Sequence, residues 1–154
     1  MTSQHLQLFL LAIAFSFLSA CAMAPTQEMS DARQAVQAAR EAGAEKHAHL
    51  ALAQAEKLFV AAEDNLGLKT YRQARNNAMA AKTQAISARK LAVAIAEATK
   101  SIDSAKALGV ATKEASAWLE RASAFAQTGD FGSALDAAQR AKALAEHDLN
   151  DHKK

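Results

Sequence analysis

The sequence predicts an all-α protein, an alanine-rich antiparallel helical bundle. Alanine makes up about a quarter of the chain, and it has the highest helix propensity of any residue. The 154 residues include only one proline and five glycines, so long helices are not interrupted. Apolar residues recur at steps of three and four in each of five segments, which is the pattern of a helix with one buried face.

The first twenty residues predict an export signal and not a part of the fold. Residues 6–18 are nearly all apolar, whereas a membrane-spanning helix needs about 20 such residues. A short apolar run followed by small residues is typical of a secretory signal peptide, although no Lys or Arg precedes it here. The residues that follow, Leu18-Ser19-Ala20-Cys21, resemble the lipobox of bacterial lipoproteins.

Cys21 is the only cysteine, so it forms no internal disulfide, and no Cys/His spacing fits zinc. The lipobox resemblance implies that a diacylglycerol is attached to its sulfur, that the leader 1–20 is removed, and that a fatty acid such as palmitate acylates the new amino terminus. Ala22 stands where many inner-membrane lipoproteins of Gram-negative bacteria carry Asp, which favours the outer membrane, facing the periplasm. We expect 21–29, which contains the only proline, to be a lipidated tether.

A bundle domain is expected over 30–149, followed by a charged tail over 150–154. Ser30 and Gly43 are suitable caps for the two ends of the first helix. The expected helices cover 30–42, 48–66, 69–108, 112–127 and 130–148. The third is one rod without Gly or Pro, and its apolar register comprises Ala74, Ala78, Ala81, Ala85, Ala88, Ala92, Ile95, Thr99 and Ile102.

An internal repeat suggests how the helices are organised. The segment 30–43 matches 96–109, and the segment 71–85 matches 131–145. The last helix of a first unit would then continue directly into the first helix of a second unit. We therefore expect two fused three-helix units that share the long central helix over 69–108.

An alanine seam buries little area, because burial contributes only about 25 cal/mol per Å². Larger side chains are therefore expected to supply much of the core. We expect modest stability, or stabilisation by self-association into a homo-oligomer. The expected large core residues are Leu52, Leu58, Phe59, Leu66, Tyr71, Ile86, Ile95, Trp118, Leu119, Phe125, Phe131 and Leu135.

Arg75, Lys82 and Arg89 are spaced by seven residues and form a basic ridge on one face of the third helix. No Asp or Glu occurs from 65 to 96. The ridge could contact an anionic surface, such as phospholipid headgroups, lipopolysaccharide or cell-wall polymer. Alternatively it is paired internally, with Glu63 near Arg75 and Glu56 near Lys82. Nucleic acid is not an expected partner of an exported chain with net charge +2.

No catalytic set is found, so an enzyme is not expected, and neither is a cofactor. Trp118 and Phe125, seven residues apart, are interpreted as core residues, with a binding patch as the alternative. No metal site is expected either, because no third ligand is fixed near any candidate pair. The candidate pairs are His47 with His49, His147 with Asp151, and Asp148 with His152.

Three segments together resemble a bacterial family known as domain of unknown function 4398, whose members are often short exported lipoproteins. They are SDARQAVQAAREAGAEKHA from Ser30, LAQAEKLFVAAEDNL from Leu52, and YRQARNNAMAAKTQAISAR from Tyr71. Members usually carry Ala-Pro after the A-G-A turn, whereas His49 follows Ala48 here. The resemblance implies a helical lipoprotein and adds no activity.

A second comparison is with the murein lipoprotein, which joins peptidoglycan through a C-terminal lysine. This chain also ends in lysines, Lys153 and Lys154, but the five glycines argue against a single rod. The expected function is a lipid-anchored, non-enzymatic scaffold or adaptor in a Gram-negative cell envelope, with an unidentified envelope protein as partner. The alternative is a peptidoglycan or anionic-surface binder that contributes to envelope integrity.

Overall fold

The computed structural model describes residues 23–152, and all regular structure in that range is helical. The helices are α2 (Thr26–Glu41), α3 (Ala44–His47), α4 (His49–Gly67), α5 (Tyr71–Ala107), α6 (Lys113–Thr128) and α7 (Phe131–His152). The predicted all-α fold is confirmed. The rod predicted over 69–108 is α5, which has 37 residues and is therefore about 55 Å long.

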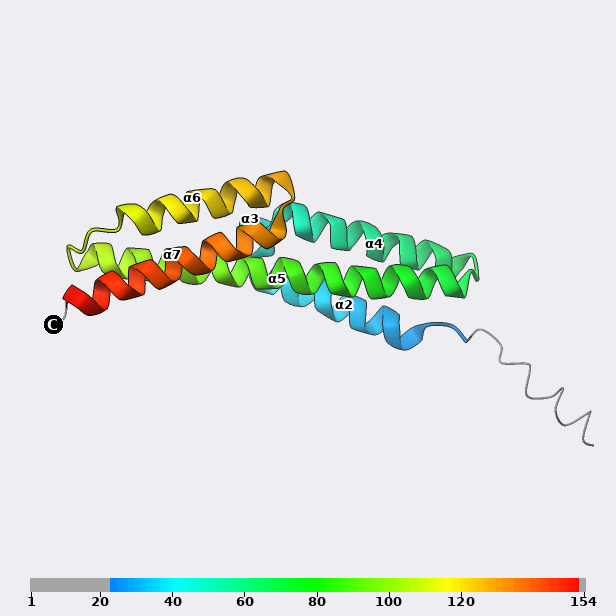
Figure 1. Cartoon of the computed structure of the whole chain (residues 1–154). Coiled ribbons are helices and arrows are strands. Elements are labelled where there is room, and N and C mark those ends of the chain that lie inside the picture. The colour runs from blue at the N-terminus through cyan, green and yellow to red at the C-terminus, as the bar shows by residue number, and fades with distance from the viewer. Residues whose placement is uncertain (1–22, 153–154) are drawn as a thin grey trace, which may run out of the picture.

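Helix α5 is the axis on which the other long helices pack (Figure 1). Helices α2 and α4 lie along its first half, and α6 and α7 lie along its second half. Each long helix reverses the direction of the one before it, so α2, α5 and α7 run the same way. The result is an elongated molecule in which α2 begins near one end and α7 ends near the other (Figure 1).

The turns before α5 and α7 show that the predicted repeat is structural. In the first unit, the Thr70 N–H donates a hydrogen bond to the Asn65 carbonyl oxygen at 2.9 Å. Sixty residues later, the Asp130 N–H donates to the Phe125 carbonyl oxygen at 3.0 Å. The two turns therefore close with equivalent backbone hydrogen bonds.

An ion pair recurs between the first and third helices of each unit. Lys82 Nζ lies 2.8 Å from Asp31 Oδ2 in the first unit, and Lys142 Nζ lies 2.9 Å from Glu97 Oε2 in the second. Lys142 lies 60 positions after Lys82, and Glu97 lies 66 positions after Asp31. The second half of α5 therefore occupies the place in the second unit that α2 occupies in the first.

Helix α3 accounts for the six-residue difference between these two offsets. In both units the first helix ends at a left-handed glycine, Gly43 with φ 80° or Gly109 with φ 75°. The first unit then inserts the short helix α3 before α4 begins at His49. The second unit passes from Gly109 to α6 at Lys113 without a helix. Because α3 also contacts α5, it lies at the junction of the two units.

Alanine dominates the core to a greater extent than predicted. Of the 30 buried apolar residues between 23 and 152, 24 are alanines, and this includes every alanine of the predicted α5 register. Among the large residues expected in the core, Leu52 and Ile95 are buried, but Ile86 and Phe125 are exposed. Leu91, which was not expected there, is 1% exposed. Most of the other large residues expected in the core pack around the edge of the alanine seam and keep partial contact with water.

Both ends of the bundle extend beyond the predicted boundaries. The tether predicted over 21–29 becomes helical at Thr26, because the Pro25 carbonyl already accepts the Met29 N–H at 3.0 Å. Met29 is 5% exposed and belongs to the core of the first unit. At the other end, α7 continues to His152, so the first residues of the predicted tail 150–154 are helical.

The repeat identifies one backbone position where the chain lacks the preferred residue. Lys69 adopts a left-handed conformation with φ 58°, and its equivalent in the second unit is Gly129 with φ 86°. We expect Lys69→Gly to raise the free energy of unfolding by about 0.5–1 kcal/mol, because glycine avoids the steric cost of this conformation. Gly129→Ala should lower it by a similar amount. Urea denaturation followed by circular dichroism measures both, and a destabilised Lys69→Gly variant would contradict the prediction.

Candidate functional site

Cys21, the predicted site of lipid attachment, lies outside the described residues, as does the leader 1–20. The described chain begins at Met23, whose side chain is 80% exposed. Its carbonyl oxygen accepts a hydrogen bond from Arg75 Nη2 at 3.2 Å, which holds this segment against the start of α5. Within residues 23–152, no helix is both long and apolar enough to cross a membrane.

The predicted basic ridge is largely paired inside the bundle. Arg75 Nε donates to Glu28 Oε1 at 2.7 Å, and Lys82 Nζ donates to Asp31 Oδ2 at 2.8 Å. Both carboxylates belong to α2, which runs parallel to the first half of α5. Of the three ridge residues, Arg89 is the exception: it is exposed and has no ion pair with any residue from 23 to 152.

The carboxyl pKa values report the same pairing. The pKa of Asp31 lies below its ordinary value because the carboxylate accepts hydrogen bonds, first from Lys82 and then from Gln27. The pKa of Glu28 is also lowered, first by a backbone hydrogen bond and then by the hydrogen bond from Arg75. Each shift favours the ionised carboxylate in the folded chain, so both pairs are formed at neutral pH.

The partners proposed for the ridge from the sequence were wrong. Glu63 accepts from Arg33 Nη2 at 3.3 Å, and Glu56 accepts from Arg40 Nη2 at 2.6 Å. Both arginines belong to α2, so α4 forms these ion pairs with α2 and not with α5. All of these side chains keep a substantial exposed fraction, and exposed pairs of this kind contribute only about 0–1 kcal/mol each.

Beside the ridge, α5 presents a second row of exposed side chains that was not predicted from the sequence, and one of its members, Ile86, was expected in the core. Met79, Ile86 and Val93 are spaced by seven residues, and their exposed fractions are 54%, 40% and 39%. Arg72, Arg89 and Lys90 are exposed cations on the same part of α5. We call these six residues the α5 outer face.

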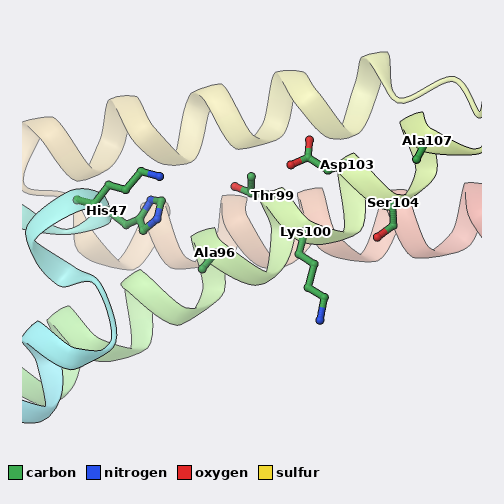
Figure 2. A pocket seen from close by; sticks show the side chains of 8 residues that line it. His47, Ala96, Thr99, Lys100, Asp103, Ser104 and Ala107 are labelled. Carbon is green, nitrogen blue, oxygen red and sulfur yellow. The ribbon is translucent and has the colours of Figure 1, made fainter.

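An open groove of about 520 Å³ lies where α3 meets the second half of α5. Figure 2 shows His47 at one end of the groove and a row of α5 side chains along it. Lys100 and Asp103 point in different directions, and Thr99 and Ser104 are separated along the helix (Figure 2). The polar groups therefore do not converge on one point, as the groups of a catalytic site must.

His47 is expected to make the stability of the bundle depend on pH. Its pKa lies below the ordinary value of 6.5, chiefly because burial disfavours the imidazolium and secondarily because Lys46 is close. The unfolded chain therefore binds a proton at this residue at a higher pH than the folded chain does. We expect the free energy of unfolding to fall modestly as the pH is lowered from about 7 to about 5.

Thermal unfolding at a series of pH values measures this dependence. His47→Gln should reduce the slope between about pH 7 and 5 relative to the wild type. The carboxylates with lowered pKa values act in a different window, because their contribution is lost only as the pH falls below their ordinary values near 4. A His47→Gln variant with the slope of the wild type would contradict the role of His47.

Trp118 and Phe125 do not form one patch. Trp118 packs against the core, and the guanidinium carbons of Arg121 and Arg140 lie 4.6 and 4.9 Å from its ring centroid. Phe125 is 37% exposed and lies beyond this cluster on α6. Two cations of its own chain thus lie over the indole. The packing of Trp118 against the core supports its interpretation as a core residue, whereas the exposure of Phe125 does not support that interpretation for Phe125.

One histidine near the C-terminus, His147, pairs with carboxylates of its own helix. His147 Nδ1 lies 3.5 Å from Asp151 Oδ2 and 3.8 Å from Asp148 Oδ1. Over the described range, no three His, Cys, Asp or Glu side chains are grouped so that they could hold a metal ion. Lys153 and Lys154 lie outside that range.

Comparisons of the chain with protein-family models, with curated proteins and with solved structures find no match. The resemblance noted for residues 30–89 therefore stays a prediction, and the function has to be inferred from the residues themselves.

Proposed function

We propose that this chain is a lipid-anchored, non-enzymatic protein of a Gram-negative cell envelope that acts as a scaffold or adaptor. The observation that carries the proposal is the sequence Leu18-Ser19-Ala20-Cys21 after the apolar run 6–18. A thiol at that place, preceded by small residues, provides the nucleophile that lipid attachment requires. Acyl chains on one residue anchor a protein stably, because each buried methylene contributes about 0.8 kcal/mol.

The architecture supports a scaffold more than a binding pocket. A core built from alanine leaves little internal space, and the grooves on the described surface are open. The two units instead form an extended surface along α5 (Figure 1). A partner protein in the periplasm would bind to such a surface, with the amino-terminal end of the bundle held close to the outer membrane.

The short link between Cys21 and the bundle also supports an anchored role. Helix α2 begins at Thr26, so only residues 22–25 separate the predicted lipid site from the fold. These four residues reach at most about 14 Å when extended. A bundle attached in this way would stay at the membrane surface.

Globomycin, which blocks removal of lipoprotein leaders, tests the proposal. Treated cells should accumulate the unprocessed precursor, and mass spectrometry of the protein from untreated cells should show an acylated Cys21. Cys21→Ser should abolish both acylation and leader removal. Met23→Ser, which adds the same hydroxyl two residues later, should leave both intact. An unacylated mature chain, or processing that is insensitive to globomycin, would refute the anchor.

The alternative function, binding of an anionic surface or of peptidoglycan, draws support from one observation. Arg72, Arg89 and Lys90 form no ion pair with any residue between 23 and 152. These cations are available to an external anion, whereas Arg75 and Lys82 are not.

A further inference from the structure

The α5 outer face combines apolar and cationic side chains that no other element covers. Met79, Ile86 and Val93 each expose more than a third of their surface, and the seven-residue spacing aligns them along the helix. Aligned apolar residues that remain exposed on an otherwise well-packed helix indicate a contact with something outside the bundle.

The charges on this face have one sign. Arg72, Arg89 and Lys90 surround the apolar row, and no Asp or Glu occurs in α5 before Glu97. The nearest carboxylates of α2, Glu28 and Asp31, are already engaged by Arg75 and Lys82. An apolar row bordered by uncompensated cations is typical of a helix that lies in the interface of an anionic membrane.

The chain enters the bundle beside this face. The Met23 carbonyl is held by Arg75, which precedes Met79 by one helical turn. Cys21 comes two residues before Met23, a distance of at most about 7 Å along the chain. Acyl chains on Cys21 would therefore bring lipid to the end of the α5 outer face at which the chain enters.

A second copy of the chain fits this face poorly. In a parallel pairing, Arg72, Arg89 and Lys90 of one copy would face the same residues of the other. In an antiparallel pairing centred on Ile86, Lys90 would lie opposite Lys82, and Arg72 opposite Lys100. Like charges would meet in both arrangements, which disfavours the association. An anionic bilayer complements the same charges.

We propose that the α5 outer face docks on the surface of a bilayer that contains anionic phospholipid, an inference that rests on the proposed lipid anchor at Cys21. Met79, Ile86 and Val93 enter the headgroup region, and Arg72, Arg89 and Lys90 contact phosphate groups. The anchor keeps the face at an effective concentration in the millimolar range, about that of a short linker, so a small docking surface is sufficient. The first unit then lies along the membrane.

A lipid-attached quencher tests the docking in the full acylated protein. Ile86→Cys and, separately, Val60→Cys introduce one thiol for a fluorophore, since acylation consumes the thiol of Cys21. Val60 is 54% exposed and lines a groove formed by α2 and α4 residues, away from the α5 outer face. In vesicles that contain phosphatidylglycerol, the label at 86 should be quenched and the label at 60 should not.

Charge variants test the cause of the docking. Replacing Arg72, Arg89 and Lys90 with Gln should lower the ratio of docked to undocked protein on the order of 100-fold, since each cation near an anionic surface contributes a factor of about five and the three factors multiply. The matched control replaces Lys100, Lys106 and Lys113 with Gln, which removes the same charge from the second unit and should change the ratio little. High salt should release the α5 outer face of the wild-type protein from the anionic vesicles.

The outcomes separate the docking from the anchor. Flotation of the protein with neutral phosphatidylcholine vesicles, together with the mass of Cys21, reports the anchor alone. An anchored protein whose label at 86 stays unquenched in anionic vesicles overturns the docking and leaves the anchor intact. Two further outcomes would overturn the docking by assigning the α5 outer face to another partner. One is the formation of disulfide-linked dimers by the Ile86→Cys variant. The other is binding of the unlabelled protein to purified peptidoglycan, if the triple Gln variant loses that binding.

Discussion

Replacing Leu91 with alanine is expected to lower the free energy of unfolding by about 2–5 kcal/mol. Leu91 is 1% exposed and is the largest fully buried side chain of α5. It belongs to the central core cluster, to which α2 and α4 contribute as well as α6 and α7. A cavity at this position would therefore weaken the packing of both units together, and the surrounding alanines are too short to fill it.

Urea denaturation of the purified protein, followed by circular dichroism at 222 nm (the helix band), measures the effect. Leu68→Ala is the matched control, because Leu68 is 75% exposed and the same atoms are removed. It should change the free energy of unfolding by less than about 0.5 kcal/mol. If the two variants show the same small decrease in the free energy of unfolding, Leu91 does not hold the two units together.

Replacing an alanine of the buried seam with a larger residue should also lower the free energy of unfolding. Ala85 is completely buried in the central core cluster, where α5 meets its neighbours. Ala85→Leu adds three carbon atoms where the helices approach closely, and such overpacking costs about 1–3 kcal/mol and occasionally more. The expected result is a lower unfolding midpoint and a loss of well-dispersed methyl signals in nuclear magnetic resonance spectra.

Ala96→Leu provides the comparison for Ala85→Leu. Ala96 lies on the same helix but is exposed, so the two changes have the same helix propensity and differ only in packing. The Ala96 variant should unfold at nearly the same urea concentration as the wild type. An Ala85 variant that is as stable as the Ala96 variant would show that the alanine seam is loosely packed.

The position of the helices was predictable because helical periodicity is a local property. The alanines of the α5 register, from Ala74 to Ala92, are all buried, as is Ile95. Their spacing alone determines that they share one face. The helix ends were less predictable: Thr26 begins α2 four residues early because Pro25 can precede a first turn without losing a hydrogen bond.

Properties that depend on which helices are neighbours were predicted less well. Glu56 and Glu63 of α4 were expected to form ion pairs with cations of α5, because helices adjacent in sequence were assumed to pair. Both carboxylates instead form ion pairs with arginines of α2. Ile86 and Phe125 were expected in the core, since large apolar residues usually are. Here the close approach of alanine-lined helices displaces large side chains toward the edge, and only the assembled bundle reveals this.

The candidate sites also differ in whether a local sequence pattern is sufficient to identify them. Cys21 was identified from consecutive residues and needs no fold. The spacing of Met79, Ile86 and Val93 is visible in the sequence, but these residues lie beside the alanine register on the same helix. Without the positions of α2 and α4, nothing distinguishes a buried row from an exposed one, so the α5 outer face could not be separated from the core.

The sharing of α5 between the units has a consequence for how the molecule could vary in length. Residues 131–152 of α7 correspond to residues 71–92 of α5, so α7 ends where α5 continues into the next unit. A further copy of 93–152 placed after His152 would continue the same helix and add a third module by the same contacts. In a protein extended in this way, the number of modules would set the length of the molecule.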